Sequence, residues 1–265
     1  MSSFFSRLAV TVVALPIVLW LVWLGGWWLF ALALIAVLVA LHELYGMARS
    51  LRPLVLAGYA GAILTVLGAQ VGGVEWLMGG LLSTLLMAFL LYGIADTRQT
   101  ATITMSATLL GVAWIAGGIS CLLLLREIPD HGRLAVFVVL LAVNADDTAA
   151  YLVGRLVGRH KFAPSLSPAK TWEGFIAGSL AAIAVCFFGL YGTGFMDGWR
   201  SIVLGGAIAL AGAAGDLFES SLKRDLQVKD SGHLLGAHGG MLDRMDALLF
   251  AAVAAFYVVA AFGYG

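Results

Sequence analysis

Residues 8–47 read LAVTVVALPIVLWLVWLGGWWLFALALIAVLVALHELYGM and contain two long apolar runs, 8–24 and 27–47, separated by Gly25-Gly26. A helix that crosses a bilayer needs about 20 mostly apolar residues, so each run predicts a membrane-spanning helix. Because glycine permits tight turns, the pair is expected to form a helical hairpin. We expect no cleaved signal peptide here, since a second apolar run follows at once.

Seven further apolar runs follow, so the predicted fold is all-α: a polytopic integral membrane protein with about nine transmembrane helices. These runs cover residues 54–71, 76–95, 103–125, 134–152, 175–191, 202–218 and 247–262. The composition agrees, because 11% of the residues are charged, against about a quarter in a soluble domain. It excludes a cytosolic enzyme, a disordered protein and a nucleic-acid binder that acts through bulk charge. Cys121 and Cys186 lie in apolar runs, so no disulfide framework is expected.

Lysine and arginine predict the orientation of the spans, because cytoplasmic loops are rich in these residues. With the N-terminus in the cytoplasm, nine spans place twelve of the 15 basic residues on the cytoplasmic side and three on the other. We therefore expect an N-in, C-out chain. Residues 1–265 are expected to form a single membrane domain, in which 1–140 are mainly apolar scaffold spans and 141–265 form the catalytic half.

The first group of charged residues lies near the end of the span 134–152, where Asp146 and Asp147 stand side by side. Charge at membrane depth is costly and indicates a functional site by default. Asp147, Tyr151 and Arg155 share one helical face at a spacing of four. An ion pair of Asp147 with Arg155 that only stabilises packing is therefore the alternative interpretation.

Residues 167–171, SPAKT, are expected to form a turn that leads into a helix, with Ser167 as the N-cap and Pro168 in the first turn. Free backbone N–H groups at such a helix start attract phosphate, and Lys170 adds a positive charge. We therefore expect Lys170 to bind a substrate phosphate. An ordinary helix cap at the membrane surface is the alternative.

The second polar group, residues 216–246, is the most informative. One expected helical face carries four polar residues: Asp216, Glu219, Ser220 and Lys223. Asp243 and Asp246 are three residues apart at the start of the last span and also share a face. The glycine-rich segment 238–240 lets backbone approach a ligand closely. Two helix ends that carry carboxylates are thus expected to converge across a glycine loop.

Carboxylates among basic residues, without cysteine partners, suit a hard divalent cation together with phosphate. Mg²⁺ typically binds one or two carboxylates plus substrate phosphates, and basic side chains neutralise the remaining charge. The expected metal ligands are Asp216, Asp243 and Asp246, with Asp146 or Asp147 completing a second cation site. Lys223 is grouped with the three aspartates as a catalytic residue. The expected phosphate-binding residues are Lys170, Ser220, Arg224, Lys229, His238 and Arg244.

These motifs together resemble the signature of the phosphatidate cytidylyltransferases, also called CDP-diglyceride synthases. Over residues 220–246 the signature reads Ser220-x-Leu-Lys223-Arg224, Lys229-Asp230, His238-Gly239-Gly240 and Asp243-Arg244-x-Asp246. Two upstream elements of the family also match, Asp147-x-x-Ala150-Tyr151 and residues 167–174. Gly236 stands where proline is the commoner choice. Residues 1–140 match the family only as apolar spans.

The resemblance implies an enzyme that transfers CMP from CTP to phosphatidic acid, giving CDP-diacylglycerol and pyrophosphate for phospholipid biosynthesis. It implies Mg²⁺ at aspartates that match Asp216, Asp243 and Asp246, with K⁺ as a candidate second cation. It also implies a homodimer in the cell (inner or cytoplasmic) membrane, with the lipid bilayer around it and the active site facing the cytoplasm.

Three other classes of protein share some of these features. A transporter or channel also has carboxylates in the membrane, but its polar residues should run through the full membrane depth, whereas here they crowd one side. A lipid or polyprenol kinase would use the same metal chemistry with another nucleotide. A purely structural scaffold has no use for so many desolvated charges.

Overall fold

The computed structural model describes residues 16–95, 99–232 and 240–264. The chain divides into two compact units. Unit 1 comprises Met1–Leu124 with Leu226–Arg244, and unit 2 comprises Leu125–Asp225 with Met245–Gly265. The signature 220–246 therefore contributes residues to both units. The boundary predicted at residue 140 marks a change in composition and stays a prediction.

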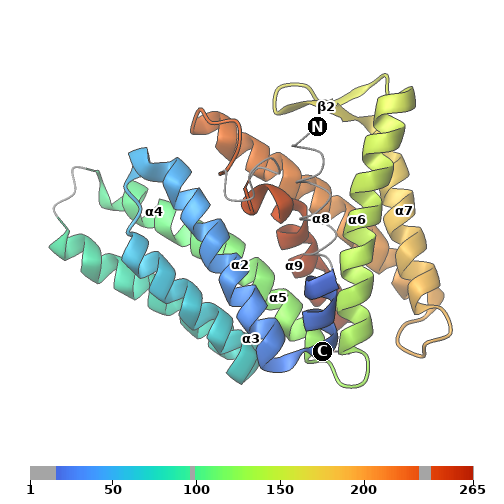
Figure 1. Cartoon of the computed structure of the whole chain (residues 1–265), viewed down its shortest axis with the longest axis horizontal. Helices are drawn as coiled ribbons and strands as arrows, with labels where there is room; N and C mark the ends of the chain where they lie inside the picture. Colours follow the sequence, from blue (N-terminus) through green and yellow to red (C-terminus); the bar gives the residue numbers. More distant parts are fainter. Residues whose placement is uncertain (1–15, 96–98, 233–239, 265) are drawn as a thin grey trace. The chain divides into compact units, whose positions relative to one another are not determined.

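Unit 1 is helical, with α2 beside α3 in Figure 1. Its elements are α2 (Gly26–Met47), the short 3-10 helix η1 (Ala48–Leu51), α3 (Val55–Ile94), α4 (Ala101–Gly111), the π-helical turn η2 (Val112–Ala116), most of α5 (Gly117–Arg126) and the 3-10 turn η4 (Leu242–Arg244). A buried hydrogen bond from the Tyr45 hydroxyl to the Thr108 carbonyl ties α2 to α4 at 2.8 Å. α4, η2 and α5 form the most buried of the long apolar segments.

α3 is interrupted at Gly73 and folds back on itself. Gly73 has φ 70° and ψ −152°, a conformation that residues with a side chain rarely adopt. The two arms touch through glycines: a Cβ on Gly80 would lie 2.5 Å from the Thr65 Cα, and one on Gly68 would lie 2.4 Å from the Trp76 carbonyl oxygen. Small residues let helices in a membrane approach this closely.

Unit 2 consists of four helices and a small hairpin. Its elements are α6 (Gly132–Val157), β1 (Lys161–Ala163), β2 (Ser167–Thr171), α7 (Trp172–Leu190), α8 (Gly198–Asp225) and α9 (Asp246–Ala261). Glycines again bring successive helices into antiparallel contact. A Cβ on Gly178 of α7 would lie 2.7 Å from Asp146 of α6, and one on Gly205 of α8 would lie 2.5 Å from the Ile183 Cα of α7.

The predicted class of an all-α membrane protein is confirmed, but the number of nine spans is not. In the described part of the chain, six helical segments are long and apolar enough to cross a membrane, and α9 is a shorter apolar helix. α3 contains two of the predicted spans, and the first predicted span, 8–24, begins outside the described residues. The N-in, C-out orientation stays a prediction.

Candidate functional site

The hairpin before α7 differs from the prediction for residues 167–171. These residues form the strand β2, which pairs antiparallel with β1, and not the start of a helix. α7 begins at Trp172, and its N-cap is Thr171, whose hydroxyl accepts a hydrogen bond from the Gly174 N–H at 3.2 Å. The prediction is wrong because proline is also tolerated at a strand edge, where its missing N–H costs no ladder bond.

Lys170 stands on β2 and places its ammonium group against a carboxylate of α8. Its Nζ donates a hydrogen bond to Oδ2 of Asp216, and the two side chains are 27% and 31% exposed. Asp146 and Asp147 on α6 interact electrostatically with both members of this pair. Oδ1 of Asp146 is buried and, within the residues that the structure describes, has no hydrogen-bond partner. Three segments of unit 2 thus bring four of the predicted site residues together.

Asp246 adds a further carboxylate to this group. We call the five residues together the unit 2 charge cluster: Asp146, Asp147, Lys170, Asp216 and Asp246. Asp246 is the first residue of α9, lies within hydrogen-bonding range of Asp216 and faces the charge of Glu219. Glu219 is 2% exposed and accepts a hydrogen bond from Lys223 Nζ at 2.9 Å. Gly215 permits the close approach of α8 to the start of α9, because a Cβ at this position would lie 2.4 Å from the Asp246 carbonyl oxygen. The predicted polar face of α8 is therefore observed, opposite the start of α9.

The unit 2 charge cluster has the chemistry of a cation site. Carboxylates at close range cannot all stay ionised without positive charge between them, and Lys170 and Lys223 supply part of that charge. Oxygen ligands of this kind suit a hard cation such as Mg²⁺. Among residues 16–95, 99–232 and 240–264, no group of three or more His, Cys, Asp or Glu side chains has metal-binding geometry. The metal site therefore stays a prediction.

Asp243 belongs to unit 1, where it binds backbone N–H groups of two residues that precede it. Its carboxylate accepts hydrogen bonds from the Gly240 N–H at 2.9 Å and from the Ser231 N–H at 3.2 and 3.3 Å. These bonds tie Ser231 and Gly240 to the same carboxylate. Gly240, the last glycine of the signature segment 238–240, is buried in unit 1. His238 lies outside the described residues. The predicted role of Asp243 as a metal ligand stays a prediction.

Glu43 is a buried carboxylate of unit 1 that the sequence analysis missed. It stands on α2, is 7% exposed and accepts hydrogen bonds from the backbone N–H groups of Met241 and Leu242 at 3.0 and 2.9 Å. The Ser231 hydroxyl donates a longer bond of 3.4 Å to the same carboxylate. One signal was available, because a carboxylate four residues before the end of the apolar run 27–47 is itself costly at membrane depth.

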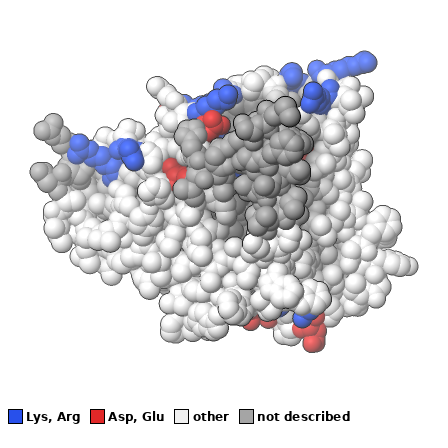
Figure 2. All heavy atoms as spheres, in the orientation of Figure 1, with Lys and Arg blue, Asp and Glu red and all other residues white. Residues whose placement is uncertain are grey.

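The other predicted phosphate-binding residues lie near the ends of helices or in the loop of unit 1. Arg224, in the last turn of α8, donates from Nε to a backbone carbonyl of the β1–β2 turn at 2.5 Å. Ser220 is half-buried on α8, and Lys229 and Arg244 are exposed in unit 1. Figure 2 shows basic side chains gathered over the hairpin end of unit 2, where three exposed basic residues lie: Arg155, Arg159 and Lys161.

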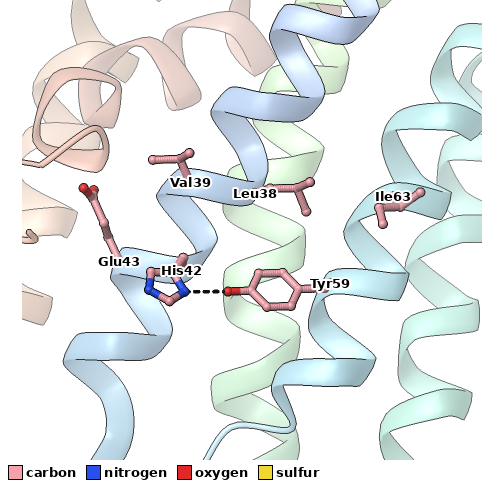
Figure 3. A pocket seen from close by; sticks show the side chains of 6 residues that line it. All are labelled: Leu38, Val39, His42, Glu43, Tyr59 and Ile63. Carbon is pink, nitrogen blue, oxygen red and sulfur yellow. Dashed lines mark hydrogen bonds between the residues drawn. The ribbon is translucent and has the colours of Figure 1, made fainter. Parts of the chain in front are cut away.

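A pocket of about 400 Å³ lies between α2 and α3 of unit 1 (Figure 3). Its apolar walls are Leu38, Val39 and Ile63, and its polar groups include a hydrogen bond of 2.8 Å between His42 Nδ1 and the Tyr59 hydroxyl. Walls of this kind suit a hydrocarbon chain better than a nucleotide.

Comparisons with known proteins find one matching family and several named relatives. The sequence profile described as the cytidylyltransferase family matches residues 5–262. A Mycobacterium bovis protein named phosphatidate cytidylyltransferase is 35% identical over 248 residues, which cover 86% of this chain and 79% of the relative. Proteins of the same name from Staphylococcus haemolyticus and Staphylococcus aureus are 33% identical, and each match covers 92% of this chain and 94% of the relative.

Proposed function

We propose that this chain, which belongs to the cytidylyltransferase family, transfers CMP from CTP to phosphatidic acid, giving CDP-diacylglycerol and pyrophosphate. The observation that carries the proposal is the similarity over most of the chain to relatives named phosphatidate cytidylyltransferase. The apolar helices and the unit 2 charge cluster support it, because the reaction joins a membrane lipid to a charged nucleotide.

The chemistry needs little more than positioning and charge stabilisation. An oxygen of the lipid phosphate forms a bond to the α-phosphorus of CTP, the bond from that phosphorus to the α–β bridging oxygen breaks, and pyrophosphate leaves. A phosphate monoester has a second pKa of about 6, so the lipid is largely dianionic at neutral pH and needs no enzyme nucleophile. Holding the two phosphates together supplies most of the catalysis.

The chemistry of the unit 2 carboxylates supports a magnesium ion in this proposal. The carboxyls of Asp216 and Asp246 lie within hydrogen-bonding range of each other, and Oδ1 of Asp146 is buried without a partner among the described residues. In our proposal Asp216 and Asp246 would hold Mg²⁺, which neutralises triphosphate charge when bound. Asp243 as a further ligand, and Asp146 or Asp147 at a second cation site, stay predictions from the sequence. K⁺ is the second cation that the family resemblance implies.

The basic residues of the chain would hold phosphates. Lys170 is paired with Asp216 and Lys223 with Glu219, so an incoming triphosphate offers each ammonium group a second negative partner. Arg224 lies one residue beyond Lys223 at the end of α8, and Ser220 offers a hydroxyl donor on the same helix. Lys229 and Arg244 would act in the same way in unit 1.

The membrane explains the arrangement of the substrates. The acyl chains of the lipid stay in the bilayer, and the pocket between α2 and α3 offers one of them an apolar surface. We propose that the protein lies in the cytoplasmic membrane with its N-terminus and its active site toward the cytoplasm, where CTP is present. The homodimer follows from the family resemblance and belongs to the same proposal.

The experiment that tests this function is release of pyrophosphate by purified protein in detergent, with CTP and phosphatidic acid, with and without Mg²⁺. We expect turnover that requires all three components. Transfer of a phosphate from ATP to a lipid hydroxyl, with release of ADP in place of pyrophosphate, would indicate a lipid kinase. Ion flux in liposomes without turnover would indicate a transporter. Either result would contradict the proposal.

A further inference from the structure

We infer that Glu43 is a positioning residue: from α2 it sets the backbone of residues 240–244 and thereby the direction of Asp243. The inference rests on the proposed function, in which Asp243 belongs to the reaction site. It assigns a specific task to the N-terminal half, which the composition of residues 1–140 presents as apolar scaffold.

The first observation is the pattern of donors around the Glu43 carboxylate. Its two oxygens accept from two successive backbone N–H groups, those of Met241 and Leu242, at 3.0 and 2.9 Å. These N–H groups lie at the start of the 3-10 turn η4, where backbone donors have no partner within the turn. Glu43 therefore caps from α2 the turn whose middle residue is Asp243.

The second observation is that a carboxylate suits this place better than an amide. A carboxylate only accepts hydrogen bonds, so both of its oxygens can face N–H and O–H donors. Glutamine at this position would turn its NH₂ group, itself a donor, toward one of these donors. Figure 3 shows the Glu43 side chain directed away from the His42–Tyr59 pair and toward the neighbouring loop ribbon. Bonds from neutral donors to a buried charged acceptor are among the stronger hydrogen bonds in proteins.

The third observation explains two glycines of the loop. A Cβ on Gly232 would lie 2.7 Å from Oε1 of Glu43, and one on Gly240 would lie 2.6 Å from Oε2 and 2.0 Å from the Ser231 hydroxyl. Both glycines are therefore packed against the carboxylate. The glycine-rich segment 238–240 predicts close approach of a ligand, whereas the space beside Gly240 in the structure is occupied by Glu43 and Ser231.

Glu43 and Asp243 together bind the backbone of Ser231 and of residues 240–242. Asp243 binds the N–H groups of Ser231 and Gly240, while Glu43 binds those of the two residues that follow Gly240. Removing the Glu43 charge leaves N–H donors of the η4 start without a matched acceptor. We expect the segment 240–244 to open more often and Asp243 to lose its fixed direction.

The test compares Glu43→Gln with the matched control Glu75→Gln, which neutralises an exposed carboxylate of α3 in the same unit. In Glu43→Gln we expect hydrogen exchange at the amides of Met241 and Leu242 to rise about tenfold or more. We expect kcat to fall about tenfold or more while KM for CTP changes by less than about threefold. Glu43→Asp, which keeps the charge but is shorter, should lie between wild type and Glu43→Gln.

A second variant keeps the inference testable if Glu43→Gln fails to fold. Gly232→Ala places a methyl group against Glu43 and should lower kcat in the wild-type background, but much less in a Glu43→Ala background, where that space is open. Additive effects of the two changes would overturn the inference. So would unchanged exchange at residues 240–244 in Glu43→Gln, or raised exchange with normal turnover.

The exchange measurement also separates this inference from the proposed function. If the wild-type protein shows no CTP-dependent release of pyrophosphate, the proposed function fails. Hydrogen exchange at the amides of residues 240–244, compared between wild type and Glu43→Gln, would then still decide whether Glu43 fixes the backbone of this segment.

Discussion

Two groups of carboxylates, each with one buried and one half-buried member, find their partners in opposite ways. In unit 1, Glu43 and Asp243 accept hydrogen bonds from backbone N–H groups of one loop. In unit 2, Asp216 and Asp246 face each other, with Lys170 and Lys223 as the nearby cations. Backbone N–H donors hold a carboxylate in a fixed direction, whereas carboxylates that face one another favour a bound cation. The first group therefore fixes the direction of Asp243, and the facing carboxylates of the second group are the first candidates for binding a metal ion.

The largest expected effect tests the second group directly. Asp246→Asn should lower kcat about 10³-fold, which corresponds to about 4 kcal/mol of transition-state stabilisation, because it removes one of two facing carboxylates. Mg²⁺ titration of pyrophosphate release measures the change. Asp225→Asn, at the exposed end of α8, is the control and should keep normal turnover. Near-normal turnover in Asp246→Asn would remove the metal assignment.

Lys170 sharpens the comparison, because it distinguishes a structural ion pair from a phosphate ligand. Lys170→Met should lower kcat/KM for CTP about 100-fold, since it removes a cation from the unit 2 charge cluster. Lys170→Arg keeps the charge and should recover part of this loss. If Lys170→Met lowers the unfolding temperature but leaves kcat/KM unchanged, Lys170 serves only its pair with Asp216.

The close approach of α8 and α9 gives a third, smaller expectation. Gly215→Ala places a methyl group 2.4 Å from the Asp246 carbonyl oxygen, and overpacking of this kind costs about 1–3 kcal/mol. Thermal unfolding in detergent measures the loss. The control is Gly206→Ala on the same helix, where a Cβ meets no heavy atom within 4 Å. Equal unfolding temperatures for the two variants would contradict the contact.

The pocket of unit 1 gives the smallest expected effect. Ile63→Trp should fill part of the space between α2 and α3 and raise KM for phosphatidic acid about twofold to fivefold, with KM for CTP unchanged. Ile35→Trp changes an exposed apolar residue of α2 outside the pocket and is the control. An unchanged KM for the lipid in Ile63→Trp would show that no acyl chain uses this pocket.

Much of the fold could be predicted from the apolar runs, while local details could not. The glycines between residues 71 and 76 mark the reversal observed at Gly73, because only glycine adopts that conformation readily. Residues 167–171 show the opposite case, since Ser-Pro fits a helix start as well as a strand edge, and pairing with β1 decides between them. Local sequence cannot resolve a choice that depends on a partner strand.

The site shows the same division between spacing along one helix and contact between distant segments. The shared face of Asp216, Glu219 and Lys223 follows from the period of the helix and was predictable. The hydrogen bonds of Glu43 were not, because they join residues nearly 200 positions apart in the sequence. A carboxylate in an apolar run indicates that it has a polar partner, but the residues of the run do not identify that partner.

The amino-acid sequence alone determined the helical membrane class, the cytidylyltransferase signature and the helix faces that carry its carboxylates, because these depend on composition and on short-range periodicity. Only the tertiary structure decided which carboxylates are satisfied by backbone and which face one another. The free energy of a buried charge depends on the donors and cations within a few ångströms of it, and folding brings these from distant parts of the chain.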